Sequence, residues 1–258
     1  MEERNDDMGD TVHGGENPSA EEQQAYWNER WAEQKTPNDW QSRRAQAILA
    51  MLQDLSLDRP RILDLGCATG WMTKMLSELG PAEGVDLSET AIEMAKSKFP
   101  GIQYTAGDLY EVELASEPVD VVVCQEVIAH VSDQELLIRR IADVIKPGGY
   151  LIISAANRFV MERVRDSDGL VGVGFEDPDE HIKKWLDLRG LKRLIEPHFK
   201  VVRSTSVIPM GERGLLRIIN SPKLNKALAW LISKRRVEAL KEKMGFGYSV
   251  IVMGQKKS

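Results

Sequence analysis

The chain has 258 residues, of which 42% are hydrophobic and 29% charged, so its size and composition suit one large α/β domain with a full core. Its formal net charge of −6 argues against a surface built mainly for nucleic acid. The first residues lack a signal-peptide pattern, and no apolar run approaches the roughly 20 residues that span a bilayer. Only two cysteines occur, so we expect a cytoplasmic protein without disulfides.

The amino-terminal part divides into a tail and two helices. Residues 1–20 are rich in Glu, Asp, Asn and Gly and have almost nothing to bury, so we predict a disordered tail. Residues 21–57 are predicted to form two helices, of which the second opens at Thr36 as a hydroxyl cap followed by proline. The first helix carries Tyr26 and two tryptophans near one face. We expect it to form a lid over a ligand site, with simple packing of an amphipathic helix as the alternative.

From residue 60 to residue 155, short apolar strands alternate with helices. The strands are expected at Arg61–Leu65, Ala82–Leu87, Ile102–Ala106, Val119–Cys124 and Tyr150–Ala155. The helices are expected at Trp71–Leu79, at Glu89–Phe99 and from a capping box at Ser132–Glu135 to Pro147. Because apolar strands of this kind are covered on both faces, the alternation predicts a doubly wound parallel sheet with right-handed crossovers.

Residues 156–258 follow a different order and are assigned to the substrate side. Two strands, Val201–Val207 and Ser249–Gln255, are expected to complete the sheet, with a helical insert at 215–244 between them. The insert has an apolar face flanked by lysines and arginines. We expect it to cover the substrate pocket or to form a homodimer contact, and contact with an amphiphilic substrate or a membrane surface is the alternative.

A glycine-rich turn connects the first core strand to its helix. It reads Asp64-Leu65-Gly66-Cys67-Ala68-Thr69-Gly70, and its small residues allow the backbone to approach a bound ligand. A dinucleotide site would require Gly-x-Gly-x-x-Gly to seat a pyrophosphate, and the turn lacks that spacing. The acid before the first glycine instead suits the cationic amino acid end of S-adenosylmethionine (SAM).

Polar side chains also follow the next three strands. Asp86 ends the second strand, about 20 residues after Gly66, where it is placed to accept hydrogen bonds from two ribose hydroxyls. Asp108 follows the third strand and is placed to accept from an adenine amino group. Gln125 and Glu126 end the fourth strand and face the crevice in which open α/β sheets bind ligands.

The chain resembles the class I SAM-dependent methyltransferases in four segments that keep the family's order and spacing. These segments are Ile62–Gly70, Gly84–Ser88, Gly107–Asp108 and Lys146–Gly149. The resemblance implies SAM as cofactor and a seven-stranded, mostly parallel, Rossmann-like sheet whose last strand is antiparallel. It makes 21–258 one methyltransferase domain with 60–155 as its SAM-binding core, although Ala68 stands where glycine is often found. The residues expected to contact SAM are Asp64, Gly66, Cys67, Ala68, Gly70, Asp86, Leu87, Asp108, Leu109, Gln125 and Glu126.

Two histidines are candidates for a base that removes the acceptor's proton. His130 lies in Cys124–Val131, which resembles a segment of ubiquinone-type O-methyltransferases in which two glutamates and a histidine gather a divalent metal. Glu126 and His130 match, but Ala129 replaces the second glutamate, so we predict no metal. His181 lies in a loop similar to one that overlooks the acceptor in small-molecule methyltransferases, and we favour it as the base. Packing of His130 and solvation of His181 are the alternatives.

The acceptor is expected beside Tyr26, Asn157 and Arg158, since the last two follow the fifth strand at the crevice. The expected reaction is methyl transfer to an oxygen or nitrogen of a metabolite, natural product or sugar. A lipid-linked or quinone-type acceptor and a SAM-binding protein without catalysis are the alternatives. Nucleic acid is not expected as a substrate, because no Asn/Asp-Pro-Pro-Tyr-type motif follows the fourth strand.

Overall fold

The computed structural model describes residues 11–12, 18–33, 36–164, 182–209, 221 and 233–257. A seven-stranded sheet with the strand order β4-β3-β2-β5-β6-β9-β8 forms its centre. Strand β9 runs antiparallel to both of its neighbours, and the other neighbouring pairs are parallel. The predicted seven-stranded sheet with an antiparallel last strand is therefore confirmed. The strands are β2 (Ile62–Leu65), β3 (Ala82–Asp86), β4 (Gln103–Ala106), β5 (Val119–Gln125), β6 (Ile145–Ala156), β8 (Phe199–Pro209) and β9 (Gly247–Lys256).

Strands β2 and β5 lie in the middle of the sheet. All four residues of β2 are buried, as are most of those of β5, which explains why both sequences are apolar runs rather than alternating patterns. Leu65 pairs in register with Val85 of β3 and with Cys124 of β5. The residues that follow these positions therefore meet at one edge of the sheet, where the strands have their carboxyl ends.

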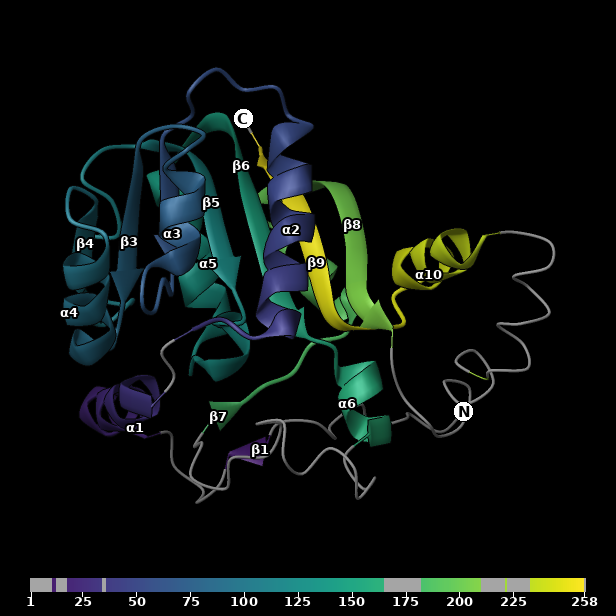
Figure 1. Cartoon of the computed structure of the whole chain (residues 1–258), viewed down its shortest axis with the longest axis horizontal. Coiled ribbons are helices and arrows are strands. Elements are labelled where there is room, and N and C mark those ends of the chain that lie inside the picture. Colours follow the sequence, from purple (N-terminus) through teal and green to yellow (C-terminus); the bar gives the residue numbers. More distant parts are fainter. Residues whose placement is uncertain are drawn as a thin grey trace.

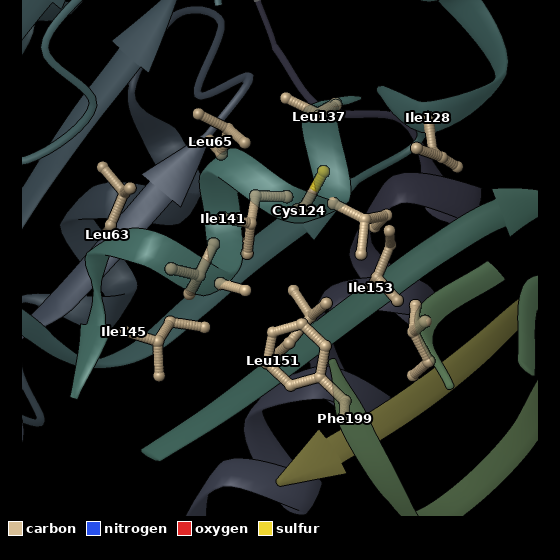
Figure 2. Packing of buried hydrophobic residues seen from close by; sticks show 14 of the residues in the cluster. Leu63, Leu65, Cys124, Ile128, Leu137, Ile141, Ile145, Leu151, Ile153 and Phe199 are labelled. Atoms are coloured by element: carbon tan, nitrogen blue, oxygen red, sulfur yellow. The ribbon is translucent and has the colours of Figure 1, made fainter. Parts of the chain in front are cut away.

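Helices cover both faces of the sheet (Figure 1). One apolar cluster joins α2 and α3 to one face through residues such as Ile48 and Met72. The other cluster brings α5 and α7 against the opposite face, and Figure 2 shows Ile141 of α5 beside Cys124 and Phe199 beside Leu151 in it. The helices of the two layers are α2 (Asp39–Gln53), α3 (Trp71–Leu76), α4 (Glu89–Lys98), α5 (Gln134–Val144) and α7 (Leu188–Ile195).

Two helices begin later than the sequence predicts. The cap of α2 is Asn38 rather than Thr36, because the Asn38 side chain accepts hydrogen bonds from the amides of Trp40 and Gln41. The Gln41 side chain in turn accepts from the Asn38 amide, which completes a capping box. In α5 the cap is Asp133, whose carboxylate accepts from the Leu136 amide. In both cases an amide or carboxylate side chain occupies the capping position in place of the predicted hydroxyl.

Short elements gather beyond the carboxyl ends of the parallel strands, where Figure 1 shows α1, β7 and α6. These elements are β1 (Thr11–Val12), α1 (Ala20–Glu33), the 3-10 helix η1 (Ile128–His130), α6 (Arg158–Val164) and β7 (Ile182–Lys183). Strand β1 pairs antiparallel with β7, within the segment for which the sequence predicts a disordered tail. The other residues of 1–17 lie outside the described part of the chain.

The predicted helical insert is described only in part. Helix α10 (Lys234–Lys243) occupies its end, and of the preceding residues of 215–244 only Ser221 and Ser233 are described. Within the described ranges, no helix is long and apolar enough to cross a membrane.

Candidate active site

A cavity of about 360 Å³ opens at the carboxyl edge of the sheet. Its wall includes nearly all the residues that the sequence predicts as SAM contacts: Asp64, Gly66, Cys67, Ala68, Asp86, Leu87, Asp108, Leu109, Gln125 and Glu126. The sheet register explains this, because the loops after β2, β3, β4 and β5 all leave the sheet at the same edge. Residues from α1 and α2 close the cavity from the other sides.

The loop after β2 has the backbone conformation that its small residues favour. Gly66 has φ +75°, and a Cβ placed on it would lie 2.0 Å from Cγ2 of Val127. Gly70 is the predicted contact that does not line the cavity. It caps α3 at φ +76°, and a Cβ there would lie 2.7 Å from the Tyr104 hydroxyl oxygen. Gly70 therefore shapes the loop without facing the ligand site.

Asp64 is a buried carboxyl group at the end of β2. It is 1% exposed and accepts a 2.7 Å hydrogen bond from the Thr73 hydroxyl. Burial raises the pKa of Asp64 to about 7, since the Thr73 hydrogen bond offsets only part of the desolvation and the nearby Asp86 charge adds to it. A cationic group bound beside Asp64 would favour its ionised form.

Asp86 and Asp108 extend the acidic wall to the ends of the next two strands. Asp86 accepts hydrogen bonds from the amides of Ala68 (2.8 Å) and Ser88 (2.9 Å), which ties the loop after β2 to the end of β3. Burial raises the pKa of Asp86 despite these bonds. Asp108 accepts a 2.8 Å hydrogen bond from the Tyr110 amide and faces the same cavity.

Helix α1 is hydrogen-bonded to the turn that follows Asp86. The side chain of Asn28 accepts from the Ser88 hydroxyl (2.7 Å) and from the Thr90 amide (3.2 Å), and Gln24 donates to the Leu87 carbonyl (3.1 Å). These bonds hold the aromatic face of α1 over the cavity, which Trp27 and Trp31 line.

The candidate base His130 lines the cavity between α1 and β7. Its Nδ1 lies 3.4 Å from the Ile182 carbonyl oxygen, and its ring meets Trp27 edge to face, with centroids 5.3 Å apart. His181, the other candidate, lies outside the described residues.

The three predicted substrate contacts lie outside the cavity wall. Tyr26 packs edge to face on Trp27, with ring centroids 5.0 Å apart, on a different side of α1. Asn157 is 1% exposed and donates 2.8 Å hydrogen bonds to the carbonyls of Gly245 and Gly247, so it joins the end of β6 to the turn before β9. Arg158 forms an ion pair with Glu162, one turn along α6, at 3.8 Å.

Arg44 of α2 lines the cavity and was missed from the sequence; it contacts the predicted residues Gln125 and Glu126. Arg44 Nη1 lies 3.5 Å from Glu126 Oε1, and Arg44 Nε donates to Gln125 Oε1 at 3.4 Å. Glu126 Oε1 also accepts from the hydroxyls of Ser154 (3.0 Å) and Ser249 (2.9 Å). The sequence contains a signal for Arg44: Trp40, Gln41 and Arg44 share one face of the first turns of α2, and the buried apolar residues of that helix, such as Ile48 and Leu52, lie further along it.

Glu126 and His130 do not converge on a common metal position. Glu126 turns toward Arg44 and the two serines, whereas His130 lies between Trp27 and Ile182. In the part of the chain that the structure describes, no group of three His, Cys, Asp or Glu residues is arranged to hold a metal ion. These residues do not fit a divalent metal, and metal independence stays a prediction.

Comparison with known proteins agrees with this arrangement. Residues 63–153 match the family described as a methyltransferase domain. The ubiquinone biosynthesis O-methyltransferase of Coxiella burnetii (strain Dugway 5J108-111) is 33% identical over 111 residues, which are 41% of this chain and 47% of that protein. The protein of the same name from Brucella anthropi is 31% identical over 168 residues, covering 63% and 62% of the two chains. The chain thus spans about half the length of the first of these curated relatives.

Among solved structures, the N-methyltransferase NodS from Bradyrhizobium japonicum WM9, in complex with S-adenosyl-L-homocysteine (SAH), superposes with a TM-score of 0.62. The two chains are 15% identical, and the match covers 92% of this chain and all of NodS. At that identity the likeness establishes the fold.

Proposed function

We propose that the chain is a class I SAM-dependent methyltransferase and that it transfers the methyl group of SAM to an oxygen or nitrogen of a small-molecule acceptor. One observation carries the proposal: three carboxyl groups at successive strand ends, Asp64, Asp86 and Asp108, line the same cavity as the glycine-containing loop. The remainder of that cavity is lined by aromatic side chains, among them Trp27 and Trp40, and by Arg44.

The three acids suit the three polar parts of SAM. Asp86, which ends β3, is positioned to accept from the ribose hydroxyls, and Asp108 to accept from the adenine amino group. Asp64 would face the ammonium of the amino acid end, whose charge favours the ionised carboxylate. When bound, SAM supplies an activated methyl group on a positively charged sulfur.

The protein's part in such a reaction is to align the acceptor and to exclude water. Holding two reactants in the correct geometry supplies roughly 7–11 kcal/mol of the barrier reduction. Helix α1 contributes to this, because Asn28 and Gln24 fix it against the turn after β3 and its tryptophans cover the cavity. We therefore propose that α1 is the lid of the site.

An acceptor hydroxyl or protonated amine must also lose a proton. Of the two candidate bases, His130 lies among the described residues and lines the cavity. His181 lies outside them and stays a candidate on the sequence alone. We expect His130→Ala or His181→Ala to lower turnover about 10²–10⁴-fold at saturating SAM while SAM affinity stays near that of the parent. If both variants turn over like the parent, neither histidine is the base.

A lipid-linked or quinone-type acceptor is the second candidate, since the sequence relatives are ubiquinone biosynthesis O-methyltransferases. The deciding experiment incubates the purified full chain with SAM and a panel of metabolites, natural products, sugars and quinone precursors, and measures SAH formation. SAH formed with one acceptor class identifies the substrate type. Binding of SAM without SAH from any acceptor would favour a SAM-binding protein without catalysis, and failure to bind SAM would contradict the proposal.

A further inference from the structure

The order of the sheet divides the cavity into two halves. Strands β4, β3 and β2 form one side of the sheet and carry the acids assigned above to SAM. Strands β5, β6 and β9 lie on the other side and, together with α2, contribute Arg44, Glu126, Ala156 and Tyr248. If the first half holds SAM, as the proposed function requires, the second half is where the acceptor binds.

Of the charged groups in the second half, Arg44 is buried and Glu126 is partly buried, and their hydrogen-bonding capacity is only partly used. The side chains of Arg44 and Glu126 are 8% and 18% exposed. Within the described residues, the side-chain contacts of Glu126 are made through Oε1, with Arg44 and with the hydroxyls of Ser154 and Ser249. No hydrogen bond to Glu126 Oε2 or from Arg44 Nη2 is found within the described residues.

These two atoms are not sealed inside the protein. Among the described residues, the fully buried side-chain atoms without a partner are Arg61 Nε and Glu83 Oε1, at the other end of the sheet. Arg44 and Glu126 both line the cavity, so Oε2 and Nη2 remain accessible from it. Glu126 also has φ +59°, a left-handed conformation that costs a non-glycine residue about 1–3 kcal/mol and is typical of functional positions.

The walls around this ion pair are aromatic. Trp40 of α2 and Tyr248 of β9 meet edge to face, with ring centroids 5.0 Å apart, and Trp185 and Met161 continue the wall. Every tryptophan that the structure describes lines this cavity. Because Arg44 and Glu126 neutralise each other, the surface favours a planar, uncharged ring over an ion.

We propose that Arg44 and Glu126 anchor the reacting hydroxyl of a planar, ring-bearing acceptor between these aromatic walls. A hydroxyl has one donor and two lone pairs. Its O–H donates to Glu126 Oε2 and one lone pair accepts from Arg44 Nη2, which leaves the second lone pair free for the methyl carbon. The hydroxyl proton passes to Glu126 Oε2 as the methyl–oxygen bond forms and the methyl–sulfur bond of SAM breaks, so for this acceptor Glu126 replaces the histidines as the first proton acceptor. The pair therefore selects a hydroxylated ring and sets the direction of its attacking lone pair.

The test compares phenol with anisole, which differ in having or lacking the hydroxyl hydrogen. The full chain is saturated with SAH, and binding of each compound is measured by ligand-observed NMR. The parent protein should bind phenol at least about tenfold more tightly than anisole, because anisole cannot donate to Glu126. Absence of phenol binding, or equal affinity for the two compounds, would overturn the proposal.

Variants separate recognition from folding. The Arg44→Met/Glu126→Leu double variant replaces both charges by apolar groups and should bind the two compounds equally. Glu126→Gln keeps the shape of the side chain and should lose most of the preference for phenol, which makes a decisive comparison even if the double variant does not fold. Arg43→Met is the matched control, since Arg43 is the adjacent arginine of α2 with a side chain 52% exposed and paired with Glu242. It should keep the parent's preference.

Calorimetric titration of each variant with SAH separates this proposal from the proposed function on which it rests. Normal SAH binding with an unchanged preference for phenol in Glu126→Gln and in the double variant would refute the role of the pair. Failure of the parent chain to bind SAH would refute the proposed function itself, and the acceptor site with it.

Discussion

The pH dependence of cofactor binding is the sharpest consequence of the buried Asp64. In the ligand-free protein, desolvation raises the pKa of Asp64 to about 7. An ammonium group bound beside it lowers the pKa of the carboxyl group, so binding releases a proton wherever the free protein is protonated. Affinity for SAH should therefore be full above about pH 7 and fall as the pH drops below it.

The magnitude follows from the pKa of the free protein. If the bound carboxyl returns to its ordinary range near about 4, the affinity falls about tenfold for each pH unit below about 7. Between about pH 8 and about pH 6, SAH binding should weaken about tenfold overall, a change of about 1.4 kcal/mol.

Isothermal titration calorimetry in two buffers of different ionisation enthalpy measures both the affinity for SAH and the number of protons released on binding. At about pH 7 the experiment should find about half a proton released per SAH bound. Asp64→Asn is the control, since it keeps an acceptor for the Thr73 hydroxyl but has no proton to lose. An SAH affinity that is the same at both pH values, or a pH dependence that survives in Asp64→Asn, would refute the role of Asp64.

Three further predictions address the same site. Asp64→Asn should raise the melting temperature of the ligand-free protein at about pH 8 while weakening SAH binding. Because the pKa of Asp64 in the folded protein lies about three units above its unfolded value, ionisation of Asp64 costs the fold up to about 4 kcal/mol as the pH rises from about 4 to 7. An unchanged or lower melting temperature would contradict this. Asp86→Ala should weaken SAM binding by about 1–3 kcal/mol in calorimetry, and unchanged affinity would exclude the ribose assignment. Turnover should survive a chelator, because Glu126 and His130 do not converge on one metal position and Ala129 has no ligand atom. Loss of activity with EDTA and recovery with magnesium would refute metal independence.

The sequence predicts the half of the sheet formed by β4, β3 and β2 well, because the residues that form these strands are followed directly by the residues assigned to the ligand. Buried parallel strands must be short apolar runs, and the acids and glycines that end them are separated by regular distances along the chain. Asp64, Asp86 and Asp108 could therefore be assigned to one edge before any coordinates, and the structure places all three in one cavity.

The half of the cavity that holds Arg44 was predicted only in part, because Arg44 and the residues around it are distant in sequence and ordinary in type. Arg44 and Ser249 are separated by 205 positions, and neither belongs to a recognisable motif. Asn157 follows a strand at the expected edge, but a buried amide was needed to satisfy the carbonyls of Gly245 and Gly247, and its side chain turned to them instead of the cavity. Which residue at a strand end faces the ligand is decided by such tertiary hydrogen bonds.

A crystal structure of the full chain with SAH tests the central claim most directly. The ribose hydroxyls should lie within hydrogen-bond distance of the Asp86 carboxylate, the adenine amino group beside Asp108 and the ammonium beside Asp64, with the sulfur directed toward Arg44 and Glu126. SAH bound elsewhere, or bound in this cavity with its ribose away from Asp86, would contradict the account.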